Sequence, residues 1–422
     1  MKCKVEKSKI SGIILCPPNK SYSHRAIFLA SLTGQNSRVN NVLFSDDTKA
    51  TIEACKKFGA EIIQQGSSIV VKNPIKNDIL VSEINAENSG TTIRIASGIA
   101  SLFSREISLT GDSSLQKRPM QPLLDALQTL GAECISTNGK PPIKIKGTIK
   151  GGDVTIPGNF SSQFISSLFI CAPLTEKGIH LTIKDNLVSK PYLDATIAAM
   201  RNFGITVQTL IPYKKYNISP QIFKPTTFDV PTDLSTLALL LSAAVILGED
   251  MTIRGKIGML PQGDEVFIDI LEQLGVQLNI NDDEIKIVST DVISGGRFDL
   301  SNSPDLLPPL AILALKATKP IEIVNVKHAR LKETDRIAIL ARELTKIGLK
   351  IEERDDGLKI EPPISIKSAE LKSENDHRLF MAFCIAGLYV GNCVITDPQS
   401  VSVSYPSFIE DMSRCGAKIN LE

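Results

Sequence analysis

Six glycines recur along this chain at a nearly constant interval, and each stands where a helix-like segment gives way to a strand-like one. The local sequences are similar, as in ACKKFGAEI, ALQTLGAEC and AMRNFGITV. Glycine just beyond a helix favours the left-handed conformation that ends it, because glycine has no Cβ to clash there. The interval is about 70 residues, too long for an ordinary solenoid repeat. The sequence therefore predicts six copies of one unit, marked by Gly59, Gly131, Gly204, Gly275, Gly348 and Gly416.

Helix-like and strand-like patterns also alternate elsewhere in the chain. SHRAIFLASL has helical periodicity and is followed by the strand-like run SRVNNVLF, and TTIRIASGIASLF is followed in the same way by REISLTG. This alternation predicts an α/β protein. Two proline-rich segments, residues 16–20 and 223–233, enclose three of the six glycines, and the other three follow the second segment. The simplest architecture is two similar lobes of three units each, with a ligand site in the cleft between them.

Composition excludes several classes of partner. The net charge is only +1, so no overall field attracts nucleic acid or an acidic membrane. The longest apolar-rich run, residues 237–247, is too short to span a bilayer. The eight cysteines form no C-x-x-C pair and are expected to be free thiols in a reducing compartment. With no recognisable targeting segment at the N-terminus, we expect a cytoplasmic protein.

Hydroxyl, amide and basic side chains gather at predicted helix starts. A helix that begins near Ser21 would put Lys20 at its positive end and Arg25 one turn later. In ENSGTTIR, the small residues around Gly90 would let an anion reach backbone amides. The alternative for the first motif is a serine N-cap followed by solvated basic residues, and for the second a loop with an ordinary cap. Similar motifs contain Arg118 in QKRP, Ser161, Ser162 and Gln163 in NFSSQ, and Ser189 and Tyr192 in SKPY.

The most specific cluster is HARLKETDR, which spans residues 328–336. A charged helix start accounts for its acids, such as Glu333, but not for so many neighbouring cations. Arg378, in NDHR, stands at the start of an apolar helix, which is unfavourable unless an anion binds there. Asp233 and Asp305 each precede an apolar helix and could be either an N-cap or a functional acid.

Taken together, these motifs resemble those of the 5-enolpyruvylshikimate-3-phosphate synthase family, the 3-phosphoshikimate 1-carboxyvinyltransferases. NKSYSHR is similar to the family's Lys-Ser-x-x-x-Arg motif, and NSGTTIR to its Asn-Ala-Gly-Thr-x-x-Arg loop. KRP, SSQ, SKPY, PD, KETDR and NDHR follow in the family's order. The resemblance implies two lobes of three β-α-β-α-β-β units each, the inside-out α/β barrel of enolpyruvyl transferases. Residues 1–16 plus 231–422 would form one lobe and residues 17–230 the other.

The resemblance also implies an activity. The enolpyruvyl group of phosphoenolpyruvate would pass to the 5-hydroxyl of shikimate 3-phosphate, with release of phosphate, on the route to chorismate and the aromatic amino acids. Both substrates carry a phosphate and a carboxylate, which explains why Lys and Arg would converge in a nearly neutral protein. General acid–base action and preorganised positive charge would lower the barrier, with no metal or organic cofactor. The enzyme would be a cytoplasmic monomer that binds neither nucleic acid nor membrane.

Roles for individual residues follow from the same resemblance. Asp305, Lys20 and Glu333 would be catalytic, with Asp305 accepting the proton of the attacking hydroxyl. Shikimate 3-phosphate would contact Lys20, Ser21, Arg25, Ser161, Ser162, Gln163, Ser189, Tyr192, Asp305, His328 and Lys332. Phosphoenolpyruvate would contact Lys20, Gly90, Arg118, Gln163, Arg336 and Arg378.

Three positions depart from the family pattern. Val403 stands before the final Tyr-Pro pair, where the family often has Lys, so another cation would have to substitute. His328 stands where Asn is frequent, and its charge would depend on pH. Ser89 replaces a common Ala and could change the response to mimics of phosphoenolpyruvate.

Other functions compete with this interpretation. The sister enzyme that enolpyruvylates UDP-N-acetylglucosamine typically has a Cys in the loop that here is GDSSLQKRP. RNA 3′-phosphate cyclase-like enzymes have related repeats, but their catalytic His signature is missing. A non-catalytic anion-binding homologue is disfavoured because Lys20, Asp305 and Glu333 are all present. Nucleic-acid binding is weaker still, since no basic stripe with interleaved aromatic residues occurs.

Overall fold

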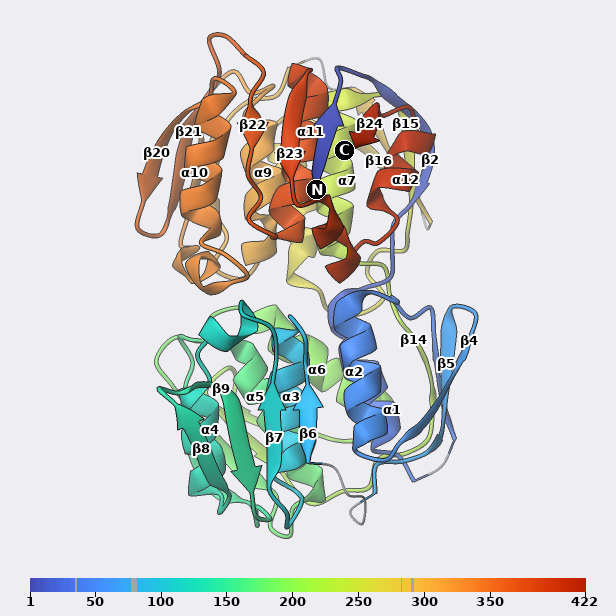
Figure 1. Cartoon of the computed structure of the whole chain (residues 1–422), viewed down its shortest axis with the longest axis vertical. Helices are drawn as coiled ribbons and strands as arrows, with labels where there is room; N and C mark the ends of the chain where they lie inside the picture. The colour runs from blue at the N-terminus through green and yellow to red at the C-terminus, as the bar shows by residue number, and fades with distance from the viewer. Residues whose placement is uncertain (35, 77–81, 282, 290–291) are drawn as a thin grey trace. The chain divides into compact units, whose positions relative to one another are not determined.

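The computed structural model describes residues 1–34, 36–76, 82–281, 283–289 and 292–422. The chain divides into two compact units (Figure 1). Unit 1 consists of residues 1–17 and 232–422, and unit 2 of residues 18–231. The chain therefore begins in unit 1, builds all of unit 2 and then returns.

Unit 2 contains three copies of a β-α-β-α-β-β motif. The first copy has α1 (Lys20–Ser31), β3 (Ser37–Asn40), α2 (Asp46–Lys57), β4 (Glu61–Gln65) and β5 (Ser68–Asn73), and takes β14 (Thr227–Asp229) as its first strand. The second has β6 (Glu83–Asn85), α3 (Gly90–Ala100), β7 (Ile107–Thr110), α4 (Gln121–Thr129), β8 (Glu133–Thr137) and β9 (Lys140–Lys146). The third has β10 (Gly152–Pro157), α5 (Ser162–Cys171), β11 (Ile179–Lys184), α6 (Lys190–Asn202), β12 (Gln208–Ile211) and β13 (Lys215–Ile218).

Unit 1 contains three further copies. The fourth has β2 (Ile10–Leu15), α7 (Leu234–Leu247), β15 (Gly248–Arg254), α8 (Val266–Gln273), β16 (Gln277–Ile280) and β17 (Glu284–Ser289). The fifth has β18 (Gly296–Asp299), α9 (Leu307–Leu313), β19 (Ile321–Val324), α10 (Arg336–Lys346), β20 (Lys350–Arg354) and β21 (Gly357–Glu361). The sixth has β22 (Glu370–Leu371), α11 (His377–Val390), β23 (Cys393–Thr396), α12 (Phe408–Arg414) and β24 (Ile419–Leu421), and takes β1 (Lys2–Val5) as its last strand.

Short 3-10 helices connect several of these elements. They are η1 (Leu115–Lys117), η2 (Ala172–Leu174), η3 (Gly263–Glu265), η4 (Pro304–Leu306), η5 (Lys327–Leu331) and η6 (Pro398–Val403).

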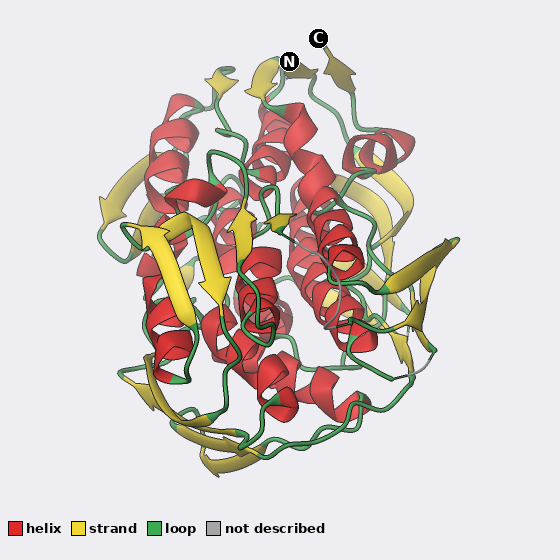
Figure 2. Ribbon diagram, turned by 60° about the horizontal axis from the view of Figure 1, so that its bottom comes forward, coloured by secondary structure: helices red, strands yellow, loops and turns green. Residues whose placement is uncertain are grey.

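Each copy forms a four-stranded sheet, and in the described part of the chain all six sheets have one topology. The first strand of a copy pairs parallel with the second, and the fourth strand pairs antiparallel with both the second and the third. In the third copy, for example, β10 and β11 are parallel with Val154 opposite Leu181, and β11 and β13 are antiparallel with Leu181 opposite Tyr216. In the second, third, fifth and sixth copies the first helix crosses between the parallel strands, as such a connection requires. Figure 2 shows the strands on the outside of the helices.

The six landmark glycines end the second helix of each copy, as the sequence predicts. All six have positive φ, between 79° for Gly204 and 112° for Gly131. The residue after each glycine donates its N–H to a carbonyl five residues earlier, as from Ala60 to Cys55 at 3.0 Å and from Ala132 to Leu127 at 3.0 Å. This is the Schellman arrangement, which satisfies carbonyls at the helix end and turns the chain into the next strand.

The two helices of a copy differ in burial. In α7, every residue from 234 to 247 is buried, because LALLLSAAVIL is apolar on all sides. This helix packs against α9 and α11 in unit 1, and α3 packs against α1 and α5 in unit 2. The second helices have one buried stripe, as in α4, where Leu123, Leu124 and Leu127 are buried and Asp125 is exposed. Helices thus form the interior of each unit and sheets its exterior, which confirms the predicted fold class.

Candidate active site

The core helices of unit 2 begin at three of the predicted anion-binding motifs. α1 begins at Lys20, and Asn19 caps it by accepting the Tyr22 N–H at 2.7 Å. α3 begins at Gly90, where Ser89 accepts the Thr92 N–H at 3.2 Å. α5 begins at Ser162 after the cap Ser161. The expected serine cap is wrong for α1, where Asn19 caps the helix, and the expected ordinary cap at α3 is correct, with Ser89 as the capping residue. The basic side chains beside these caps are not simply solvated.

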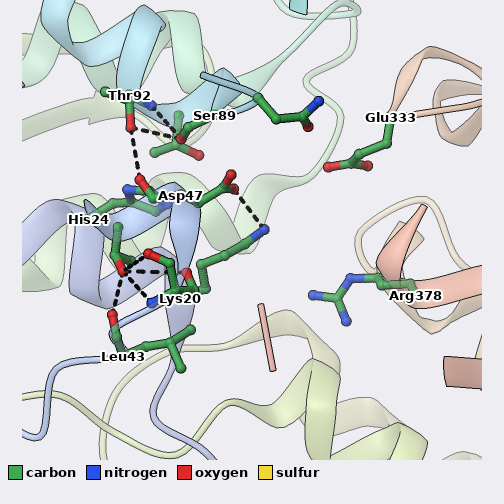
Figure 3. Close-up of polar contacts among 12 residues, drawn as sticks. Lys20, His24, Leu43, Asp47, Ser89, Thr92, Glu333 and Arg378 are labelled. Atoms are coloured by element: carbon green, nitrogen blue, oxygen red, sulfur yellow. Dashed lines mark hydrogen bonds and ion pairs between the residues drawn. The ribbon is translucent and has the colours of Figure 1, made fainter. Parts of the chain in front are cut away.

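Lys20 forms an ion pair that the sequence did not predict. Its Nζ lies 3.1 Å from Oδ2 of Asp47, in the first turn of α2 (Figure 3). The side chains are only 14% and 9% exposed, so this pair is screened much less than a surface pair. Two acids, DD, at the start of a predicted helix were the available signal for Asp47, but they fit a helix dipole equally well.

A second group surrounds the start of α3. Arg94 donates to Gln163 Oε1, and the amide of Gln163 donates to Thr91 Oγ1 at 3.0 Å. Arg118 donates to Asn88 Oδ1 at 3.0 Å. A Cβ on Gly90 would lie 3.0 Å from Arg118 Nη1, so glycine leaves this guanidinium room above the helix start.

This arrangement suits an anion. Backbone N–H groups at a helix start, the positive end of the helix dipole and a guanidinium all favour negative charge. Arg118 is 9% exposed, as is Arg94, so both charges lie mostly out of water. The candidate residues Gly90, Arg118, Ser161 and Gln163 are thus linked to the start of α3 directly or through Arg94.

Arg25 is more deeply buried than a typical ligand-binding arginine, at 1% exposure. Its Nε donates to Thr196 Oγ1 at 2.8 Å, and its two terminal nitrogens donate to the carbonyls of Ser21 at 2.9 Å and Tyr192 at 3.1 Å. Burial lowers the pKa of Arg25 to about 10, although Tyr22 acts in the opposite direction. Arg25 therefore stays charged near neutral pH and ties α1 to α6.

Ser189 has an unusual backbone for a serine. It precedes α6 in the left-handed conformation, with φ 56°, and its side chain does not cap the helix. A non-glycine residue in this region is uncommon, and such residues cluster at ligand sites.

In unit 1, one arginine gathers three carboxylates. Arg336, at the start of α10, is 1% exposed and lies 2.7 Å from Asp305, Glu333 and Asp376. Burial alone would lower the pKa of Arg336, but the three carboxylates outweigh burial and raise it. Asp376 also caps α11, accepting the Arg378 N–H at 2.9 Å. Asp376 is thus both the cap of α11 and a partner of Arg336 in an ion pair.

Asp305 also lies close to two further cations of unit 1, Lys332 and Arg378. It lies in η4 and, besides Arg336, is 3.6 Å from Lys332 and 3.5 Å from Arg378. Asp233, in contrast, accepts the Thr236 N–H at 2.9 Å as the cap of α7. The two acids that the sequence left open therefore differ: Asp233 is a helix cap and Asp305 is part of a charged cluster.

His328, in η5, stays neutral at physiological pH. Burial and the nearby Lys332 lower its pKa to about 4, against the influence of Asp305. The expectation that its charge depends on pH therefore applies only in acid.

Asp264, which the sequence analysis missed, is buried in η3 and accepts a hydrogen bond from Ser235. Burial and the charge of Asp305 raise its pKa to about 7. Its only sequence signal was the turn PQGDE before a helix, which is typical of many turns.

The structure thus brings the candidate residues together in two groups, one in each unit. We call the group in unit 2 half-site 2 and the group in unit 1 half-site 1. Half-site 2 consists of Lys20, Ser21, Arg25, Asp47, Gly90, Arg94, Arg118, Ser161, Ser162, Gln163, Ser189 and Tyr192. Half-site 1 consists of Asp264, Asp305, His328, Lys332, Glu333, Arg336, Asp376 and Arg378.

Among the described residues, no group of three or more His, Cys, Asp or Glu side chains could hold a metal ion. Nor does any helix there have the length and apolar character to cross a membrane. The eight cysteines are free thiols.

The fold is that of the enolpyruvyl transferases. The enolpyruvyl transferase NikO from Streptomyces tendae has the same fold, with a TM-score of 0.77 at 17% identity over 99% of this chain and 98% of that one. An EPSP synthase from Acinetobacter baumannii superposes with a TM-score of 0.82 at 25% identity, covering 99% of each chain.

Sequence comparison defines the family. The model for EPSP synthase (3-phosphoshikimate 1-carboxyvinyltransferase) matches residues 5–412. A 3-phosphoshikimate 1-carboxyvinyltransferase from Nitrosopumilus maritimus is 74% identical over 422 residues, covering 100% of both chains. One from Methanosphaera stadtmanae is 40% identical, covering 98% of this chain and 99% of its own. The chain therefore belongs to the EPSP synthase family, as its motifs predict.

Proposed function

We propose that this chain transfers the enolpyruvyl group of phosphoenolpyruvate to the 5-hydroxyl of shikimate 3-phosphate, giving 5-enolpyruvylshikimate 3-phosphate and phosphate. The family match over residues 5–412 carries this proposal. The two half-sites support it, because they gather the residue types that two phosphorylated carboxylic acids need.

Half-site 2 would bind anionic groups. Lys20, Ser21, Arg25 and the hydroxyls of Ser161, Ser162 and Ser189 would hold shikimate 3-phosphate, with Tyr192 beside Arg25. The start of α3 at Gly90, together with Arg118, would hold phosphoenolpyruvate, and Gln163 would contact both substrates. This assignment is supported by Arg118 lying above Gly90 and by Gln163 bonding both Arg94 and Thr91.

Half-site 1, together with Lys20 of half-site 2, would supply the proton transfers. Asp305 would accept the proton of the 5-hydroxyl group while the oxygen of that hydroxyl attacks C2 of phosphoenolpyruvate. Glu333 or Lys20 would deliver a proton to the C3 methylene. The reverse proton transfer from C3 would then expel phosphate and leave the enol ether. Lys332 and His328 would contact shikimate 3-phosphate, and Arg336 and Arg378 phosphoenolpyruvate. Three cations within 3.6 Å of Asp305 favour its ionised form, which a base requires.

The proposed reaction would use residues of both half-sites. Anions from the substrates would compete with Asp305 and Glu333 for Arg336, so binding would rearrange its ion pairs. The proposed enzyme acts as a cytoplasmic monomer and needs no metal or organic cofactor. Size-exclusion chromatography at several concentrations tests the monomer.

A phosphate-release assay tests the function. Purified protein with phosphoenolpyruvate should release phosphate when shikimate 3-phosphate is added, and the product should carry the enolpyruvyl group. Release with UDP-N-acetylglucosamine instead would identify the sister activity. Binding of both anions without release would identify a non-catalytic homologue, and either result would overturn the proposal.

A further inference from the structure

A buried chain of hydrogen bonds joins the first three helices of unit 2. His24 Nδ1 lies 2.6 Å from Thr51 Oγ1, and Thr51 Oγ1 lies 2.7 Å from Thr92 Oγ1. Thr92 Oγ1 donates to Ser89 Oγ at 2.7 Å and approaches the carbonyl of Asp47 at 3.4 Å (Figure 3). All four side chains in this chain are completely buried, at 0% exposure.

The direction of the protons follows from counting donors. The single hydroxyl proton of Thr92 is used toward Ser89 or the Asp47 carbonyl, so Thr51 must donate in the contact between the two threonines. Since the proton of Thr51 is then used, His24 must donate from Nδ1. His24 is therefore the neutral Nδ1–H tautomer. Its Nε2 has no hydrogen-bond partner among the described residues, so no contact there requires the ring proton to be on Nε2.

The surrounding charges keep His24 neutral. Burial lowers its pKa well below the ordinary value, and the cations Lys20 and Arg25 lower it further. A proton added at Nε2 would place a third positive charge near these two in a buried site.

The chain of hydrogen bonds connects places that matter to the proposed site. His24 lies one helical turn after Lys20 in α1, Thr51 one turn after Asp47 in α2, and Ser89 immediately before Gly90 in α3. The chain therefore fixes the start of α3 relative to the Lys20–Asp47 pair. Such a network loses its effect when one hydroxyl is replaced, because the remaining buried groups cannot all be satisfied.

We propose that His24, Thr51 and Thr92 are positioning residues, which hold the start of α3 at Ser89 and Gly90 in register with Lys20 for binding the phosphorylated co-substrate. This inference rests on the proposed function, since it takes the start of α3 as the phosphoenolpyruvate-binding element. The residues act through Ser89 and Gly90 and do not touch the substrate themselves.

Kinetics of three variants in the full-length protein test the proposal. Thr92→Val removes the hydroxyl at nearly constant volume and should raise KM for phosphoenolpyruvate about tenfold, the effect of about one lost hydrogen bond. KM for shikimate 3-phosphate and kcat should change less than about threefold. Thr92→Ser, which keeps the hydroxyl, should restore most of the affinity. Ser97→Ala is the matched control, because Ser97 is a buried hydroxyl of α3 that bonds only its own helix, at Ile93 O.

A spectroscopic test does not depend on activity. In wild-type protein labelled with ¹⁵N-histidine, the signal that His24→Asn removes should show the Nδ1–H tautomer. It should not titrate between pH about 8 and about 5.5. A signal of the Nε2–H tautomer, or one that titrates in this range, would overturn the proton direction and with it the proposal.

The kinetic arm has its own contrary results. Equal KM values for Thr92→Val and Ser97→Ala, or a Thr92→Ser variant as impaired as Thr92→Val, would show that the hydroxyl has no positioning role. If Thr92→Val does not fold, the histidine spectrum of the wild type still tests the proton direction on which the proposal depends. Absence of turnover by the wild type with normal histidine signals would count against the proposed function, not against the network.

Discussion

The two half-sites have opposite balances of charge. Half-site 2 has four cations, Lys20, Arg25, Arg94 and Arg118, but the carboxylate contacting them is that of Asp47, paired with Lys20. In half-site 1, three cations, Lys332, Arg336 and Arg378, contact three carboxylates, those of Asp305, Glu333 and Asp376. The first group has a net positive charge. In the second, these three cations and three carboxylates balance, and Asp264 is a further acid with a pKa of about 7.

This difference favours separate functions for the two half-sites, although both are built from the same repeated unit. Helix starts with excess positive charge bind anions, and half-site 2 is built on three of them. Carboxylates held beside cations are suited to moving protons, and they are concentrated in half-site 1. Because all six copies have the same topology, the contrast comes from side chains at corresponding helix starts and not from the fold.

The largest expected effect is on turnover, from Asp305→Ala. If half-site 1 provides the base, the loss of this carboxylate should reduce kcat by about 10²–10⁴ while the chain stays folded. Phosphate release measured at saturating substrates tests this. Asp355→Ala is the control, because Asp355 is an exposed acid of the same unit that pairs with Lys327. Comparable activity in the two variants would remove the proton-transfer role from half-site 1.

Arg336→Met tests the internal neutralisation of half-site 1. Without the guanidinium, each of the three carboxylates loses a buried cation that contacts it, and the free energy of unfolding should fall by about 3–5 kcal/mol. Urea unfolding followed by circular dichroism measures this. Arg354→Met, which removes a partly exposed arginine of β20, should cost much less. Similar losses for both would mean that the buried cluster stabilises no more than a surface pair.

Much of the fold could be predicted because it depends on local chemistry. A glycine such as Gly131 predicts a helix end from a single residue, because most other residues cannot adopt its φ of 112°. The apolar run of α7 likewise predicts a fully buried helix. The exchange of β1 and β14 into distant sheets depends on long-range pairing, which no local pattern encodes.

The site was harder to predict, because its counter-ions look like ordinary helix caps. Asp376 caps α11 and pairs with Arg336 using the same carboxylate. Asp47 stands in a first helical turn, where an acid is expected in any case. A sequence shows which residue begins a helix, but not which distant cation packs against it.

Arg118→Ala tests whether half-site 2 binds phosphoenolpyruvate. Losing this mostly buried guanidinium beside Gly90 should raise KM for phosphoenolpyruvate by about 10- to 100-fold, the effect of a hydrogen bond to a charged group. KM for shikimate 3-phosphate should change little. The control is Lys117→Ala, since Lys117 is adjacent in sequence but exposed. Selective loss of shikimate 3-phosphate binding instead would reverse the assignment within half-site 2.

His328→Asn has the smallest expected effect and tests the charge balance of half-site 1. The pKa of His328 is about 4 in the folded protein, against about 6.5 in an unfolded chain. Between these values the unfolded state binds more protons, so acid destabilises the wild type as pH falls from about 6.5 to about 4. The Asn variant lacks this titration and should gain about 1–3 kcal/mol relative to wild type between pH 7 and about 4.5. His24 titrates alike in both proteins and cancels. Unfolding curves measured at each pH test this: a constant difference would mean that His328 is charged as readily when folded as when unfolded, and half-site 1 would then carry a fourth cation in mild acid.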